Sequence, residues 1–128
     1  MAPSTIRTLI AIALFVHGVG HTLGFWKPTR SWLLPGMSEP SLRVISSIFW
    51  VLAAVGFIAA CLGFLGILVP VTWWRPLAMA FAVVSLIGLI VFWNMWPVFN
   101  TIGAFSMNIA VLVALLLLHW PPVSMFGR

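Results

Sequence analysis

Residues 6–26 read IRTLIAIALFVHGVGHTLGFW, an apolar stretch with a single formal charge, Arg7, at its start. About 20 such residues cross the hydrocarbon core of a bilayer as a helix. The stretch also contains His17 and His21, and a spacing of four residues places both imidazoles on one face of a helix. It therefore predicts a membrane-spanning helix that carries a histidine pair. A secretory signal peptide is the alternative, but His-Gly-Val-Gly-His occupies the place where cleavage requires small neutral residues.

The rest of the chain has the same apolar character. Of its 128 residues, 63% are hydrophobic and 5% charged, and the mean hydropathy is +1.21. These values are typical of an integral membrane protein. Three further apolar runs predict helices at about 42–68, 76–96 and 100–120, the first of these three capped by Ser41. Because their connections are short, we expect one domain over residues 1–128, an all-α, up-down-up-down antiparallel bundle of four transmembrane helices.

The few charged residues indicate a lipid environment. The six Lys and Arg residues fall at predicted helix ends and in loops rather than in one patch, a distribution typical of contact with lipid headgroups and not with nucleic acid. We therefore expect a multi-pass protein of an inner or plasma membrane of prokaryotic type. Its expected partners are the lipid bilayer and an apolar small molecule, with a homo-oligomer or a larger membrane complex as further options.

The depth of the polar residues suggests where a site lies. With a rise of about 1.5 Å per residue, His17, His21 and Asn108 fall in the half of the bundle nearest the long loop 27–40. This one-sided placement predicts a funnel that opens toward that loop and is sealed by hydrocarbon below. Ser85 is expected deeper and about 180° away from Asn94 on the third helix, and therefore outside the same site.

The candidate site is centred on the histidine pair. We expect His17 and His21 to face the interior as neutral rings that act on a ligand, with Gly18, Gly20 and Gly24 leaving room beside them. Simpler interpretations remain open. The rings can merely form hydrogen bonds with Asn108 or with a serine on another helix, and hydroxyl groups in membrane helices usually bond their own backbone. Glu39 can be a solvated partner of Arg30 or Arg43. The residues expected to contact the ligand are Asn108, Thr22, Ser47, Asn94 and Glu39.

A metal or haem is considered for the same pair. Two histidines at this spacing can bind a metal ion, but a zinc site needs at least three protein ligands, and Glu39 is the only carboxylate. Cys61 is the only thiol and is expected near the opposite membrane face. His119 is expected at that face too, so an intrachain bis-histidine haem is disfavoured. The cofactor is therefore unknown, with a metal ion at His17 and His21 as one option.

Three functions fit these observations. The first is a small membrane-embedded binding protein or enzyme for an apolar, lipid-like or quinone-like molecule held at His17, His21 and Asn108. The second is an accessory or assembly subunit of a larger membrane complex, and the third is an oligomeric transporter or pore. Whether the chain is an enzyme is left open, because it has no nucleophile motif, paired cysteines or Gly-rich phosphate loop.

Overall fold

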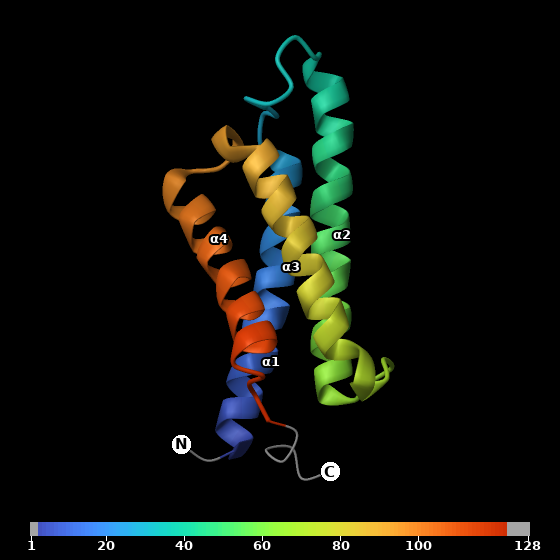
Figure 1. Cartoon of the computed structure of the whole chain (residues 1–128). Coiled ribbons are helices and arrows are strands. Elements are labelled where there is room, and N and C mark those ends of the chain that lie inside the picture. Colours follow the sequence, from blue (N-terminus) through green and yellow to red (C-terminus); the bar gives the residue numbers. More distant parts are fainter. Residues whose placement is uncertain (1–2, 123–128) are drawn as a thin grey trace.

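The computed structural model describes residues 3–122, apart from the side chains of Pro3 and Asn94. In this part of the chain four long helices run alternately up and down, so the start of α1 and the end of α4 lie at the same end of the bundle (Figure 1). Each helical segment is long and apolar enough to cross a membrane. The predicted four-span antiparallel bundle is confirmed, and the chain is a multi-pass membrane protein. The helices are α1 (Pro3–Gly20), α2 (Glu39–Leu65), α3 (Trp74–Val91) and α4 (Val98–Leu112).

The first span changes character at the second histidine. The predicted helix 6–26 is α-helical only to Gly20 and continues as a 3-10 helix, η1 (His21–Trp26). Tight packing accompanies the change, because an added Cβ at Gly24 would lie 2.5 Å from Cδ1 of Trp50. Glycine also weakens an α-helix by about 1 kcal/mol relative to alanine, so Gly20 at the end of α1 and Gly24 within η1 favour the departure.

The predicted start of the second helix is three residues late. Ser38, not Ser41, is the N-cap: its Oγ accepts a hydrogen bond from the backbone N–H of Ser41 at 3.4 Å, and Pro40 lies in the first turn. The helix ends at Leu65 rather than Leu68 because Gly66 adopts the left-handed conformation, with a φ of 72°.

The predicted end of the third helix is five residues late. α3 ends at Val91, and a 3-10 turn, η3 (Trp93–Met95), leads toward α4. Side chains of the first loop bind the last carbonyls of α3: Ser31 Oγ donates to Val91 O at 2.7 Å, and Trp32 Nε1 donates to Ile90 O at 2.6 Å. These bonds satisfy carbonyls that a helix end leaves unpaired.

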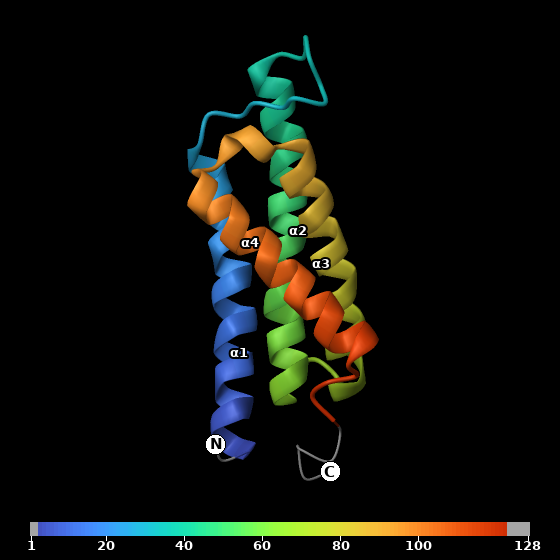
Figure 2. The ribbon, with the colours of Figure 1, turned by 60° about the vertical axis from the view of Figure 1, so that its left-hand side comes forward.

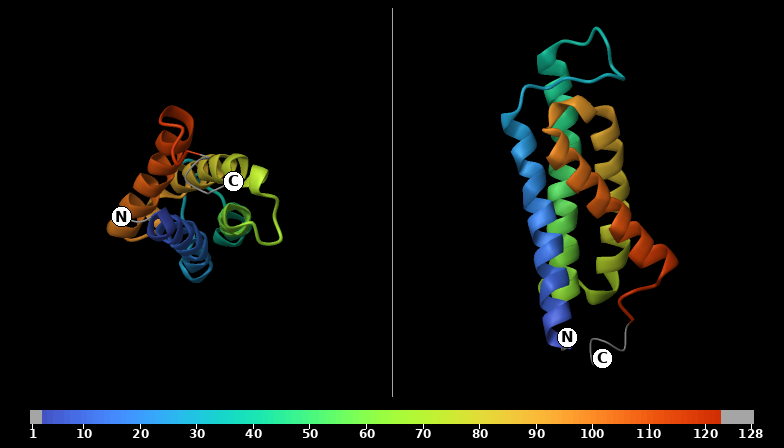
Figure 3. Two further views of the ribbon diagram at one scale, coloured as in Figure 1. Left: turned by 90° about the horizontal axis from the view of Figure 1, so that it is seen from below. Right: turned by 90° about the vertical axis from the view of Figure 1, so that its left-hand side faces the viewer.

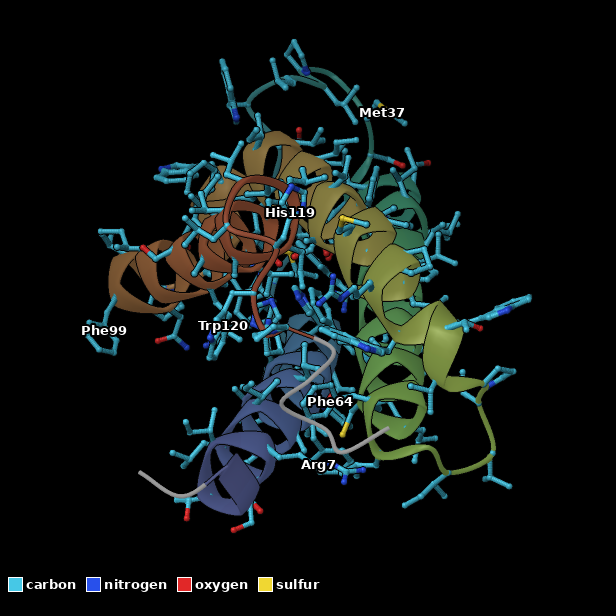
Figure 4. The ribbon with its side chains drawn as sticks, turned by 60° about the horizontal axis from the view of Figure 1, so that its bottom comes forward. Arg7, Met37, Phe64, Phe99, His119 and Trp120 are labelled. Atoms are coloured by element: carbon cyan, nitrogen blue, oxygen red, sulfur yellow. The ribbon has the colours of Figure 1, made fainter. Side chains whose placement is uncertain are left out.

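The fourth helix also differs at both ends from the range 100–120. α4 begins at Val98, after Pro97, and its last turn is a π-helix, η4 (Val113–Leu117). Figure 4, which looks at the lower end of the bundle, shows His119 and Trp120 in the segment that follows. The φ of His119 is 48°, so this residue lies outside the helix.

α2 is the central packing element of the bundle. It packs against both α1 and α3, whereas α4 packs mainly on α3. Close contact between α2 and α3 requires glycine at position 56, where an added Cβ would lie 1.9 Å from Cγ of Phe81. Figures 2 and 3 show α4 leaning across α3, so that α4 approaches α1 near its own start and diverges from it toward its end. The seam between α1 and α4 is therefore the open side of the bundle.

Candidate functional site in the bundle core

Four polar side chains from three of the four membrane spans form one hydrogen-bonded chain. His17 Nε2 lies 2.9 Å from Asn108 Oδ1, Asn108 Nδ2 donates to Ser85 Oγ at 2.7 Å, and Ser85 Oγ lies 3.0 Å from His21 Nε2. The predicted proximity of His17 and Asn108 is thus confirmed. His21, Ser85 and Asn108 are buried, with exposed fractions of 4%, 0% and 0%. We call these four residues the histidine network.

Aromatic side chains of α2 hold the two imidazoles in place. The His21 ring is stacked against Trp50 and Phe57, with interplanar angles of 13° and 9° and centroid distances of 5.7 and 6.2 Å. The His17 ring packs edge-on against Phe57 at 4.6 Å and against His21 at 4.9 Å. Trp50 and Phe57 are two helical turns apart on one face of α2, so the ring of His21 is fixed from both sides.

The network separates two apolar clusters. One contains Leu14, Phe57 and Val111, and the other contains Trp50, Leu89 and Met95. Ser85 lies between members of the two clusters along α3, and Asn108 does so along α4. The buried polar side chains do gather in the half of the bundle nearest the long loop, as expected, but that half also contains the second apolar cluster. The structure places a polar layer between apolar layers.

Both imidazoles line a cavity of about 220 Å³ between the first span and the first half of α4. Two of its lining residues, Val16 and Leu23, are 60% and 51% exposed on the outer surface, so the cavity borders the open seam between α1 and α4. Added Cβ atoms at Gly20 and Gly103 would meet nothing within 4 Å, which leaves space beside the rings. The other lining residues are Leu89, Trp96, Asn100 and Ala104.

The glycines of the first span have different roles from those expected. Gly20 borders the cavity, as predicted. At Gly18, however, an added Cβ would lie 3.1 Å from Ala54 O, and Gly24 accommodates the indole of Trp50. These two positions therefore serve helix packing rather than access to the rings.

A second hollow, of about 230 Å³, lies lower on the same seam. Its walls are apolar and come from α1, α3, α4 and the segment after α4, which contributes Trp120 and Pro121. Ile10 and Leu14 line it from α1, and Met107 and Val111 from α4. The seam thus offers one hollow with imidazoles and one that is purely hydrocarbon in character.

Ser85 is the member of the network that the sequence analysis placed outside the site, and that prediction is wrong. The error follows from the helix boundary. When α3 is taken to end near Trp96, Ser85 lies about 16 Å below its end, but with the observed end at Val91 the depth is only about 9 Å. Comparing its direction with that of Asn94 is not valid either, because residue 94 belongs to η3 and not to α3.

Three residues expected to contact a ligand lie apart from the histidine cavity. Thr22 Oγ1 donates to Val19 O at 2.7 Å, the backbone bond that was the simpler interpretation. Ser47 lines an outer surface hollow with Val44 and Val51, because on α2 it is the preceding residue, Ser46, that points inward. Glu39 pairs with Arg43 at the start of α2 and accepts a hydrogen bond from the N–H of Thr29 at 3.3 Å, which ties the loop to that helix. The side chain of Asn94 lies outside what the structure describes.

At this site the structure offers only the two imidazoles as ligands for a metal ion or a haem iron. No group of three or more His, Cys, Asp and Glu side chains is arranged to hold a metal ion among residues 3–122. The Cys61 thiol is buried and lies 3.3 Å from Ala11 O, one and a half turns before His17 on α1. His119 lies beyond the far end of α4, at the end of the bundle where α1 begins (Figures 1 and 4).

Comparison of the chain with protein-family models, curated proteins and solved structures finds no match. The functional argument therefore rests on the site itself.

Proposed function

We propose that this protein binds an apolar, lipid-like or quinone-like molecule whose polar end reaches His17 and His21 from the seam between α1 and α4. The observation that carries this proposal is that both imidazoles, that of His21 buried and that of His17 half-buried, line a cavity that borders the outer surface of the bundle. A concave, mostly apolar space with a few polar groups is the usual form of a small-molecule site.

The position of the cavity supports an apolar ligand. A molecule dissolved in the bilayer can reach the seam without crossing water, and the lower hollow offers hydrocarbon walls for its remainder. Asn108 holds His17 in place from α4, and Ser85 holds His21 from α3. In this proposal the imidazoles contact the ligand, whereas Asn108 and Ser85 are positioning residues.

The histidine pair leaves both binding and catalysis available. Neutral imidazole carries one donor and one acceptor nitrogen, so it can bind a polar group and can also pass on a proton. We further propose that the protein resides in a plasma or bacterial inner membrane, because a bundle of apolar α-helical spans suits those bilayers.

The test is to identify what purifies with the protein. The full chain is extracted in mild detergent, and its bound small molecules are released with organic solvent and analysed by mass spectrometry, with elemental analysis of the same sample. We expect an apolar molecule to accompany the unsubstituted protein in a fixed ratio and to be lost from His17→Phe. His119→Phe is the matched control and should retain the molecule, since it removes an imidazole that lies outside the cavity.

Equal retention by both variants would refute the proposal, provided that both remain folded by circular dichroism. A protein that carries nothing, and in which His17→Phe still joins the same membrane complex, would instead be an accessory subunit.

A further inference from the structure

The hydrogen bonds of the histidine network determine which nitrogen of each imidazole carries a hydrogen and which carries a lone pair. A neutral imidazole has one N–H and one lone pair, and here both Nε2 atoms are already bonded within the network. With Asn108 Oδ1 facing His17, the Nε2 of His17 is the donor. Asn108 Nδ2 then donates to Ser85, and the Ser85 hydroxyl donates to Nε2 of His21. Nδ1 of His17 therefore carries a lone pair, and Nδ1 of His21 carries a hydrogen.

Exchanging the positions of Oδ1 and Nδ2 in the Asn108 amide also gives one donor and one acceptor among the two Nδ1 atoms. Nδ2 then donates to His17, Oδ1 accepts from the Ser85 hydroxyl, and Ser85 accepts from His21. The roles of the two Nδ1 atoms are exchanged, but one is still a donor and the other an acceptor. If all three hydrogen bonds form and the Ser85 hydrogen takes part in one of them, the two rings must be opposite tautomers.

If the two rings were identical tautomers, one hydrogen-bonding group of the network would have no partner. If both Nδ1 atoms carried lone pairs, Ser85 Oγ would receive two hydrogens and its own hydrogen would have no acceptor among the described residues. If both Nδ1 atoms carried hydrogens, the single Ser85 hydrogen would be required by both Asn108 and His21. Either arrangement leaves a buried polar group unpaired, which costs about 1–3 kcal/mol.

We infer that the cavity takes the hydroxyl group of an apolar molecule, such as an alcohol or a quinol, bound between His17 and His21. This inference rests on the function proposed above and specifies its ligand. A hydroxyl donates one hydrogen bond and accepts another, which matches one lone pair and one N–H. The ring centroids are 4.9 Å apart, so both rings are close enough to share one small group.

The same match disfavours other polar groups. A metal ion needs a lone pair from both rings, and a carboxylate or other anion needs a hydrogen from both. An ether or a quinone carbonyl only accepts, and so leaves the second ring without a partner. The network therefore selects for a hydroxyl over these groups, and for a quinol over the corresponding quinone.

The tautomers can be read directly by ¹⁵N NMR of the full chain, labelled at histidine, in lipid nanodiscs. His119→Phe leaves only the two network histidines, so each ring gives its own pair of nitrogen signals. We expect one ring with Nδ1 protonated and the other with Nε2 protonated. The same tautomer on both rings would overturn the inference even if a ligand binds. This measurement needs no substitution within the network.

The ligand is tested with a matched pair of probes, 1-dodecanol and its methyl ether. Both are apolar and accept hydrogen bonds, but only the alcohol donates. We expect dodecanol to shift the imidazole signals at a mole fraction in the bilayer at least about 5-fold lower than the ether does. Ser85→Ala should reduce the difference between the mole fractions of alcohol and ether that are needed, because both rings can then present an N–H to the ether oxygen.

The outcomes separate this inference from the proposed function. Equal binding of alcohol and ether would overturn the hydroxyl assignment and leave apolar-ligand binding in place. Opposite tautomers with no response to either probe, together with no co-purified molecule, would overturn both proposals.

Discussion

A double-mutant cycle between Asn108 and Ser85 tests the histidine network through protein stability. Asn108→Leu removes the hydrogen bonds to His17 and Ser85, and Ser85→Ala removes those to Asn108 and His21. Hydrogen bonds between membrane helices contribute about 0.6 kcal/mol on average and up to about 1.7. Each single substitution should therefore lower the free energy of unfolding by about 1.2–3.4 kcal/mol.

The double substitution removes three bonds rather than four, because the Asn108–Ser85 bond is shared. Its effect should fall short of the sum of the single effects by one bond, about 0.6–1.7 kcal/mol. Unfolding in mixed micelles of mild detergent and sodium dodecyl sulfate, followed by circular dichroism, measures these differences.

Thr101→Ala combined with Ser85→Ala is the control cycle. Thr101 Oγ1 donates to Pro97 O within its own segment and shares no hydrogen-bond partner with Ser85. This pair should be additive to within about 0.3–0.5 kcal/mol. If the Asn108–Ser85 pair were equally additive, the continuous network would be refuted, and with it the argument from tautomers.

Three further predictions concern single positions. Gly56→Ala should lower the unfolding free energy by about 1–3 kcal/mol, because its Cβ would overlap the ring of Phe81. Gly103→Ala, whose Cβ meets nothing within 4 Å, should be neutral or should raise the unfolding free energy by up to about 1 kcal/mol. Equal effects of the two substitutions in the unfolding assay would contradict the packing at these two positions. Gly103→Leu should fill the cavity and abolish the dodecanol-induced NMR shifts without loss of fold, and retention of those shifts would place the ligand elsewhere. Glu39→Gln should change neither the unfolding midpoint nor the co-purified molecule, because its exposed ion pair with Arg43 lies at the start of α2, apart from the cavity; a loss of the molecule would restore Glu39 as a site residue.

The sequence was sufficient for the four spans because hydrocarbon thickness sets the length of each apolar run, and prolines mark their ends. It could not show where α3 ends, because its last carbonyls are bound by Ser31 and Trp32, about 60 residues earlier in the chain. That boundary error of five residues is also what displaced Ser85 from the predicted site.

Within the site, helix depth was enough to pair His17 with Asn108, since both lie in regular α-helix. The same reasoning failed for Ser47, where direction around the helix mattered more than depth. Gly103 and Trp96 were missed for another reason: a glycine or a tryptophan in an apolar run carries no signal that distinguishes a cavity wall from ordinary packing. Only the position of α4 relative to α1 reveals it.

The contribution of Asn108 from the fourth span has a consequence for biogenesis. α4 is the last of the four spans to leave the ribosome, and α2 can already pack against α1 and α3 before it arrives. Until then Nε2 of His17 has no partner, and the Ser85 hydroxyl has only His21. Insertion of α4 thus supplies the partner that the imidazole lacks in a three-span intermediate, and a chain without α4 would carry the cost of an unpaired polar group within the membrane.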